Sequence, residues 1–304
     1  MTGNKQSVKS KVRKKKMKKI VVGILLAGIL MTTIVGCGNK DGFDTKRSVN
    51  AITREDGSGT RGAFVELFEL EEVQADGSKK DLISKDIGVE NNTNTILTTV
   101  AEDTYAIGYI SMGSLNDSIK AAQIDGVAAT AENVKNSSYK ISRPFAIATK
   151  SDPSELVQDF IGFILSKEGE EVVAGSYIAI TDNADVYAGD KPDGTITIGG
   201  SSSVSPLMEK LIERYKEVNP NASVELQISD SSIGMTQTIE GAYDIGMASR
   251  ALKDSEKEEL EDTQIALDGI AVIVNLENEL TSLSEDEVKQ IYLGEVEAWS
   301  DIIK

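Results

Sequence analysis

Apolar residues recur along this chain in two alternating patterns, short β-branched runs and longer runs with helical spacing. Ser48–Thr53 is expected to be a strand, and Phe64, Leu67 and Phe68 recur after it at helical spacing. Further strands are expected at 105–110, 120–124, 139–141, 143–149, 195–198 and 224–228. Because strands alternate with helices, the pattern predicts an α/β fold.

Other helices are expected at 153–167 and 204–218, each with an apolar stripe, and at about 235–240, after the stretch 229–234. The clearest is 204–218, whose apolar residues recur every three or four positions. The polar stretch 71–85 predicts a loop with a short helix. The acidic stretch 186–192, which contains Gly and Pro, predicts a connector.

A turn rich in glycine and hydroxyl residues joins the first strand to its helix. Gly57 and Gly59 allow a close backbone approach, and the hydroxyls of Ser58 and Thr60 add donors. A helix N-terminus suits an oxyanion, and Arg54 can offer it a planar fork of N–H groups. The plain alternative is a capped turn with solvated charges.

The same theme returns at 199–206, which begins Gly-Gly-Ser-Ser-Ser, and at 229–234, which reads Ser-Asp-Ser-Ser-Ile-Gly. Each start taken alone is most often an N-cap. Three such starts without a neighbouring Lys or His favour one oxyanion cradle. None matches a P-loop or a Gly-x-Ser-x-Gly elbow.

The first 36 residues are typical of a secretory signal. They hold nine Lys or Arg, no acid, and an apolar run from Ile20 to Val35 that is shorter than a membrane span. Cys37 follows as in a bacterial lipobox, although Ile34 is less usual there than Leu, so we expect it to receive lipid. A retained anchor with an incidental cysteine is the alternative. Translation could also start at Met17.

Composition excludes several kinds of chemistry. The chain has one Cys and no His, so disulfides, Cys-based zinc sites, thiol catalysis and His-dependent triads are not expected. Removal of residues 1–36 leaves 23 basic residues against 49 acids, a formal charge of about −26. Such a surface repels nucleic acid and anionic lipid, so an anion site must depend on local dipoles and hydrogen bonds.

Several motifs together resemble the phosphate-binding protein of high-affinity phosphate ABC importers. They lie at 54–62, 108–111, 200–207, 244–250, 265–272 and 283–302. The resemblance covers nearly all of 45–304. It implies a two-lobed, type II periplasmic-binding-protein-like α/β fold with an anion held between the lobes, no cofactor, and an ABC permease with its ATPase as partners.

The order of these motifs differs from that of the family. There the serine-glycine start comes first, and the Arg-x-Asp-Gly-Ser-Gly-Thr turn follows the Trp-containing helix. We therefore expect a circular permutation, with the old ends joined in the connector 186–193; a fragment of a tandem protein is the alternative. The expected parts are a signal at 1–36, a tether at 37–47, lobe A at 48–142 plus 269–304, and lobe B at 143–268.

The resemblance assigns eight ligand-binding positions, Arg54, Ser58, Gly59 and Thr60 from lobe A and Ser202, Ser203, Ser231 and Ser249 from lobe B. Arg54 would be the fixed positive charge, with Asp56 holding its guanidinium. We expect Arg61, Arg143 and Arg250 to be solvated or structural.

Two departures from the family bear on selectivity. Many members have an aspartate where Ser249 stands, and it accepts the proton of hydrogen phosphate. Sulfate lacks that proton, so a carboxylate there would be left unpaired and would reject it. Asp230 replaces a glycine that is usual in the family, and its alternative role is to cap the N-terminus of the following helix. Discrimination would then rest on Asp56, on Asp230, or on neither.

Three functions follow from these readings. The first is a lipid-anchored extracytoplasmic receptor, expected to be a monomer, that closes on phosphate or another tetrahedral oxyanion and docks on a permease. The second is a secreted phosphatase or serine hydrolase, which lacks a general base in this sequence. The third is an adhesin or signalling lipoprotein that keeps the fold without the ligand.

Overall fold

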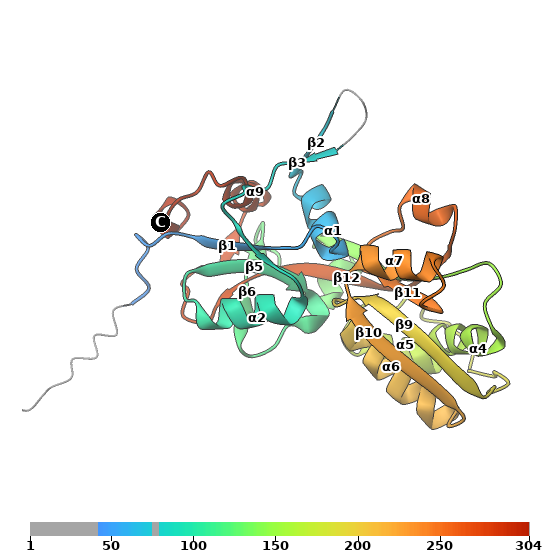
Figure 1. Cartoon of the computed structure of the whole chain (residues 1–304). Helices are drawn as coiled ribbons and strands as arrows, with labels where there is room; N and C mark the ends of the chain where they lie inside the picture. Colours follow the sequence, from blue (N-terminus) through green and yellow to red (C-terminus); the bar gives the residue numbers. More distant parts are fainter. Residues whose placement is uncertain (1–41, 75–78, 304) are drawn as a thin grey trace, which may run out of the picture. The chain divides into compact units, whose positions relative to one another are not determined.

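The computed structural model describes residues 42–74 and 79–303, and its alternating strands and helices confirm the α/β prediction (Figure 1). The strands are β1 (Asn50–Arg54), β2 (Glu71–Val73), β3 (Lys79–Asp81), β4 (Gly88–Glu90), β5 (Ala106–Ser111), β6 (Ile119–Ala121), β7 (Gln123–Ile124), β8 (Ser142–Thr149), β9 (Gly194–Ser201), β10 (Ala222–Ser229), β11 (Ile245–Ala248), β12 (Glu261–Asn275) and β13 (Ser282–Leu283). The helices are α1 (Gly59–Leu67), α2 (Thr93–Glu102), α3 (Ala131–Lys135), α4 (Glu155–Ile164), α5 (Lys167–Ala174), α6 (Ser205–Val218), α7 (Ser231–Ile239), α8 (Asp254–Lys257) and α9 (Glu285–Leu293), with 3₁₀ turns η1 (Met112–Ser114) and η2 (Trp299–Asp301).

Strand β12 is the longest described strand, with 15 residues, and it links two groups of strands in one sheet. Its first part pairs antiparallel with β8, and its second part pairs antiparallel with β5 and β6. On one side β8 continues to β11, β9 and β10; on the other β5 continues to β1 and β4. The strands β1, β4 and β5 run parallel, as do β9, β10 and β11, which brings their carboxyl ends, and the turns after them, to common edges.

The buried apolar residues form two large clusters that divide near the same strands. One cluster draws on residues between 52 and 141, Ile178, and residues from 270 on, and it includes Phe64 stacked on Tyr109 at 3.8 Å between ring centroids. The other draws on residues between 145 and 266 and includes the apolar stripe of α6 with Tyr215. The helical spacing read from 204–218 therefore buries one face of α6, as predicted.

Some predicted elements are corrected. Residues 71–73 and 79–81 form the antiparallel pair β2–β3 where a loop with a short helix was expected, and residues 139–141 precede β8 without forming a strand. Lys167 does not end a helix but begins α5, because the hydroxyl of Ser166 caps it by accepting from the Gly169 N–H. Likewise α7 begins at Ser231, earlier than expected, because Asp230 caps it.

The first described residues pair with the last ones. The Val49 N–H donates to the Glu297 carbonyl at 3.1 Å, and the Trp299 N–H donates to the Arg47 carbonyl at 3.1 Å. The Phe43 ring lies edge-on to Trp299 at 5.6 Å. The C-terminus accordingly lies beside the start of the described chain (Figure 1).

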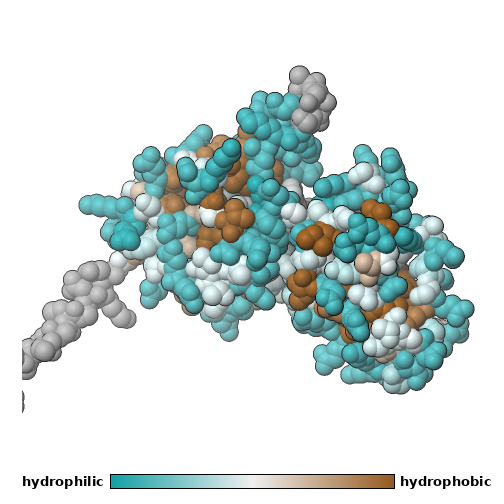
Figure 2. All heavy atoms as spheres, viewed as in Figure 1, coloured by the Kyte–Doolittle hydropathy of each residue, from teal (hydrophilic) through white to brown (hydrophobic). Residues whose placement is uncertain are grey.

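The predicted signal, the lipobox and Cys37 lie outside the described residues. Among the residues that are described, no helix is long and apolar enough to cross a membrane. Hydrophilic residues cover most of the face shown in Figure 2, as the acidic composition indicates. The exposed large apolar residues are Val73, Val89, Leu165, Ile180, Val186, Ile228, Ile233 and Leu276.

Candidate functional site

The turn after β1 is fixed from both ends. At the strand end, the buried Tyr109 hydroxyl lies 2.6 Å from Thr53 Oγ1 and accepts from the Arg54 N–H at 3.2 Å. Burial raises the pKa of Tyr109, so this hydroxyl keeps its proton and can donate and accept together. At the helix end, Ser58 caps α1 by accepting from the Arg61 N–H. The strand, turn and helix predicted around 53–62 are thus confirmed.

Arg54 is buried, with 2% of the residue exposed, and its guanidinium is held by three neighbours. Nε donates to Glu55 Oε2 at 2.8 Å and Nη2 to Glu55 Oε1 at 2.7 Å. Nη2 also donates to Ser202 Oγ at 3.1 Å, and Nη1 to Thr93 Oγ1 at 3.4 Å. One edge of the Arg54 guanidinium is therefore paired with the Glu55 carboxylate, while its Nη groups also donate to the hydroxyls of Thr93 and Ser202.

Buried hydroxyls from several distant segments converge around this fork. Thr60 Oγ1 lies 2.7 Å from Ser203 Oγ and 3.4 Å from Ser249 Oγ. Ser249 Oγ in turn accepts from Ser201 Oγ at 3.0 Å, and the Ser249 N–H donates to Ser231 Oγ at 3.1 Å. All five residues are at least 97% buried. Hydroxyls can donate or accept, so this cluster can adapt to oxygen atoms of a ligand.

Four helices begin at the cluster. They are α1 capped by Ser58, α2 capped by Asn92, α7 capped by Asp230, and α6, which follows the Ser201–Val204 turn without a side-chain cap. Each helix start adds partial positive charge and N–H donors. Together with Arg54, these starts make a site suited to a small anion with several oxygens.

A cavity of about 1110 Å³ opens beside the cluster. Its lining residues are Glu55, Glu90, Asn91, Asn92, Thr93, Asn94, Thr95, Thr98, Thr99, Ser202, Ser205, Pro206, Glu209, Ile228, Ser229, Asp230 and Ile233. The cavity shares Glu55, Thr93 and Ser202 with the surroundings of Arg54, so it offers a path from solvent to the cradle.

The structure brings together most of the sequence-predicted site. Ser58, Gly59, Thr60, Ser202, Ser203, Ser231 and Ser249 lie with Arg54 in this neighbourhood. Asp56 is the exception. Its side chain is 99% exposed and lies 3.6 Å from Arg61, so the carboxylate that holds Arg54 is Glu55, not Asp56. The turn directs residue 55 to the Arg54 guanidinium and residue 56 to solvent.

Asp230 takes the N-cap role, since its Oδ1 accepts from the Ile233 N–H at 2.8 Å. The three other arginines named from the sequence are paired structurally. Arg61 pairs with Asp81, Arg143 with Asp268 and Arg250 with Glu256.

Sequence reasoning missed Thr93, Ser201 and Glu55. Thr93 is 3% exposed, and its Oγ1 lies 3.3 Å from both Ser202 Oγ and Ser203 Oγ. Its signal was present, because Asn92-Thr93-Asn94-Thr95 is a fourth polar helix start of the kind found elsewhere in the chain. Within residues 42–74 and 79–303, no group of three His, Cys, Asp or Glu side chains is arranged to hold a metal ion.

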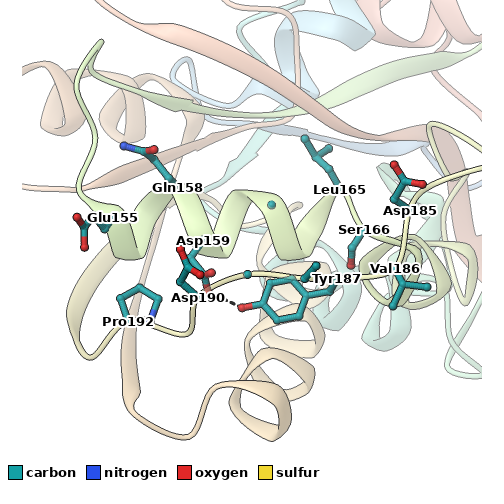
Figure 3. Close-up of a pocket in the computed structure, with 13 residues that line it drawn as sticks. Glu155, Gln158, Asp159, Leu165, Ser166, Asp185, Val186, Tyr187, Asp190 and Pro192 are labelled. Atoms are coloured by element: carbon teal, nitrogen blue, oxygen red, sulfur yellow. Dashed lines mark hydrogen bonds between the residues drawn. The ribbon is translucent and has the colours of Figure 1, made fainter.

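A second cavity, of about 610 Å³, lies under the connector (Figure 3). Its lining has carboxylates from Glu155, Asp159, Asp185 and Asp190 and no Lys or Arg. The cavity beside the cluster is also lined by four carboxylates and no Lys or Arg, but of the two cavities it is the one whose lining residues Glu55, Thr93 and Ser202 contact the buried guanidinium of Arg54, so it is the better candidate.

Comparison with known proteins places this geometry in a family. A family model described as a PBP superfamily domain matches residues 38–168 and 185–303. Phosphate-binding protein PstS 2 of Streptococcus agalactiae is 47% identical over 93% of this chain and 96% of its own. Phosphate-binding protein PstS of Bacillus subtilis is 34% identical over 40% of this chain and 41% of its own.

A solved structure agrees with these sequence matches. The crystal structure of a phosphate ABC transporter, phosphate-binding protein from Streptococcus pneumoniae is 41% identical and covers 84% of this chain and 99% of its own, with a TM-score of 0.67. The chain therefore belongs to the phosphate-binding proteins of the PBP superfamily.

Proposed function

We propose that this protein is a receptor that captures inorganic phosphate between two lobes and delivers it to an ABC permease. The observation that carries the proposal is the meeting of polar groups from distant segments, with Arg54 reaching Ser202 at 3.1 Å and Thr60 reaching Ser203 at 2.7 Å. Relatives named as phosphate-binding proteins support phosphate as the anion. The proposed ligand set is Arg54, Ser58, Gly59, Thr60, Ser202, Ser203, Ser231 and Ser249, to which we add Thr93.

The lobes proposed here are residues 48–142 plus 269–304 and residues 143–268. The two hydrophobic clusters support this division, because one draws on residues up to 141 and from 270, with Ile178 as its one buried member from 143–268, and the other draws on residues 145–266. The chain would pass between lobes at β8 and β12, where Arg143 pairs with Asp268. Hinge motion there would open and close the cradle.

Selectivity in this proposal does not use a carboxylate at position 249. Ser249 can accept the proton of hydrogen phosphate or donate to an unprotonated oxygen, so it rejects neither phosphate nor sulfate by itself. Asp56 is too exposed to reach the anion, and Asp230 is committed to its N-cap. We therefore expect weaker exclusion of sulfate than a buried carboxylate acceptor would give.

Location and attachment belong to the same proposal. The basic and apolar start of the chain and Cys37 support export, signal cleavage and lipid attachment at the outer side of the membrane. A tether from Cys37 would then lead directly into residues 45–49, which pair with 297–300. The permease would receive phosphate from a receptor held at the membrane surface.

Circular permutation is also part of the proposal. The match to the Streptococcus agalactiae protein runs through 93% of this chain, whereas the match to the Bacillus subtilis protein covers 40%. A permuted order relative to the second protein, shared with the first, would produce such a difference. The pairing of the two chain ends supports it as well.

Calorimetry on the mature chain carrying Cys37→Ser tests the function. We expect saturable heat with inorganic phosphate, weaker heat with sulfate, and loss of both in Arg54→Ala. Molybdate and phosphonates probe the alternative of another tetrahedral oxyanion. Absence of any anion binding would favour an adhesin or signalling role, and hydrolysis of a chromogenic phosphate ester would favour the hydrolase.

A further inference from the structure

At Gly57 and Gly59 the space around the residue, and not the backbone conformation, excludes a side chain. Neither has a positive φ, so an L-residue could adopt either conformation. A Cβ on Gly57 would instead lie 2.5 Å from Asp230 Cγ, and a Cβ on Gly59 would lie 2.5 Å from Ser231 Oγ and 2.8 Å from Ser249 Oγ. The turn is therefore constrained by contact with the start of α7 and the end of β11.

The Asp230 side chain is held where it meets Gly57. Its Oδ1 accepts from the Ile233 N–H at 2.8 Å, so rotation away from Gly57 would break the cap of α7. A backbone hydrogen bond fixes the same approach, with the Ser232 N–H donating to the Gly57 carbonyl at 3.2 Å. The two helix starts are thus joined backbone to backbone at this point.

We propose that Gly57 and Asp230 are positioning residues that set how closely the two halves of the cradle approach. This inference rests on the proposed phosphate-binding function. Arg54 reaches Ser202 at 3.1 Å and Thr60 reaches Ser203 at 2.7 Å across the same gap. Hydrogen bonds weaken steeply beyond these lengths, so a separation of several tenths of an ångström at Gly57 weakens the whole set.

A Cβ at position 57 should disturb the approach of the two halves of the cradle far more than the folding of either half. Alanine at position 57 meets no backbone strain, so it leaves each half folded and removes some freedom from the unfolded chain. The three atoms nearest to its Cβ all belong to the Asp230 side chain. A replacement there should reduce anion affinity while the thermal stability of the anion-free protein stays equal or rises.

The test uses one variant that obstructs the Gly57–Asp230 contact, one control variant, and two second substitutions that could restore binding. Gly57→Ala introduces the Cβ. Gly62→Ala adds a methyl to α1, the helix that follows Gly57, at a position where no other part of the protein lies within 4 Å. Asp230→Gly, combined with Gly57→Ala, removes the obstructing side chain and keeps a tolerated N-cap. Asp230→Asn in the same background keeps the size of the side chain.

Two readouts are used on the mature chain carrying Cys37→Ser. Calorimetric titration with inorganic phosphate measures affinity. Spin labels on cysteines at the exposed positions 118 and 216 measure the distance between the halves with and without phosphate. We expect Gly57→Ala to lower affinity at least tenfold and to lengthen the label distance with phosphate, and Gly62→Ala to change neither.

The second substitutions at Asp230 test whether the loss of affinity comes from the clash between the new Cβ and the Asp230 side chain. Asp230→Gly should restore affinity and distance in the Gly57→Ala background, and Asp230→Asn should not. Unchanged distance in Gly57→Ala, or equal rescue by glycine and asparagine, would overturn the inference. If the unaltered chain binds no phosphate, the proposed function fails, and the label distances of the anion-free proteins still report whether the added Cβ separates the halves.

Discussion

Arg54 and Glu55, neighbours in the chain, face each other through two hydrogen bonds of 2.8 and 2.7 Å between guanidinium and carboxylate. Such a bidentate pair fixes the plane of the guanidinium. The Nη groups are left directed at Ser202 and Thr93, where an anion between the hydroxyls would meet them. Glu55 thus orients the one guanidinium that contacts the cradle hydroxyls in the described structure.

Arg54→Ala should weaken phosphate binding by roughly a hundredfold. A charge-assisted hydrogen bond in a desolvated site contributes about 1.5–3 kcal/mol, and the anion would lose its fixed positive charge. Titration calorimetry at fixed ionic strength measures the effect. Arg61→Ala is the control, because its guanidinium pairs with Asp81. Equal losses from both substitutions would remove Arg54 from its assigned role.

Thr93→Val should weaken phosphate binding by about fivefold. Valine keeps the shape of threonine but removes a hydroxyl 3.3 Å from both Ser202 and Ser203, and one hydrogen bond is worth about 1 kcal/mol. Thr195→Val, at an exposed position of β9 outside the cavity lining, should change affinity little. If both variants bind like the parent, Thr93 belongs to the packing of α2 and not to the ligand set.

The site shows where prediction from sequence succeeded. Local patterns sufficed for the turn at 57–60 and the serine-rich start at 201–205, because glycines and hydroxyls before a helix limit the local structure to few forms. They did not suffice for Glu55 and Asp56, which are equally plausible partners of Arg54 in sequence. The choice depends on the direction of two side chains at a turn, which tertiary packing sets.

The fold shows the same division. The spacing at 204–218 predicted α6 well, since an amphipathic stripe reflects burial directly. The stretch 139–141 looked like a strand because its apolar residues are buried, yet Tyr139 reaches the Ile270 carbonyl through its hydroxyl and the segment stays irregular. Short apolar runs report burial, and pairing with another strand is a separate condition.

The buried pair at β8 and β12 predicts a pH dependence. Asp268 is fully buried, accepts from Arg143 Nη2 at 3.1 Å and from Ser111 Oγ at 3.0 Å, and burial raises its pKa to about 6 against the opposing effects of these partners. Burial also lowers the pKa of Arg143. Tyr177, whose pKa burial raises, faces the same pair.

The sign follows from proton binding. Between about pH 4 and pH 6 the folded protein holds a proton on Asp268 that the unfolded chain has lost, so this contribution to the free energy of unfolding is full below pH 4 and is lost as pH rises through 6. Asp268→Asn should remove that decline, whatever fixed effect the amide has on stability. Urea unfolding at several pH values measures the slopes. Exposed Asp262→Asn is the control; identical slopes for all three proteins would contradict the shift.

Cys37→Ser should abolish lipid attachment. A thioether to diacylglycerol needs the thiol of the residue after the cleavage site, and Cys37 is the only cysteine of the chain. Metabolic labelling with a radioactive fatty acid, followed by fractionation, measures the outcome. The variant should stay attached through its uncleaved signal or appear in the medium, in both cases without label. Label retained in the variant would refute the lipobox.

Reversal of the permutation is the most demanding prediction. Thr45 and Ser300 are joined by a backbone hydrogen bond, so a linker of about four glycines and serines can connect Lys304 to Thr45. The new ends belong between Ala188 and Gly189. This cut spares the bond from Tyr187 to Asp159 on α4 that Figure 3 shows, which a cut on the other side of Tyr187 would strain.

The rearranged chain should fold and bind phosphate within about threefold of the parent. Every described helix and strand stays intact, and closing a short loop costs little, about 0.6 kcal/mol for each doubling of its length. Circular dichroism, thermal unfolding and phosphate titration measure the result. A matched chain opened inside β9, between Ile196 and Thr197, should fail, because it divides a strand paired on both sides. If the first chain also fails to fold as a monomer, the two ends do not belong to one continuous lobe, and a domain-swapped or tandem arrangement would replace the permuted one.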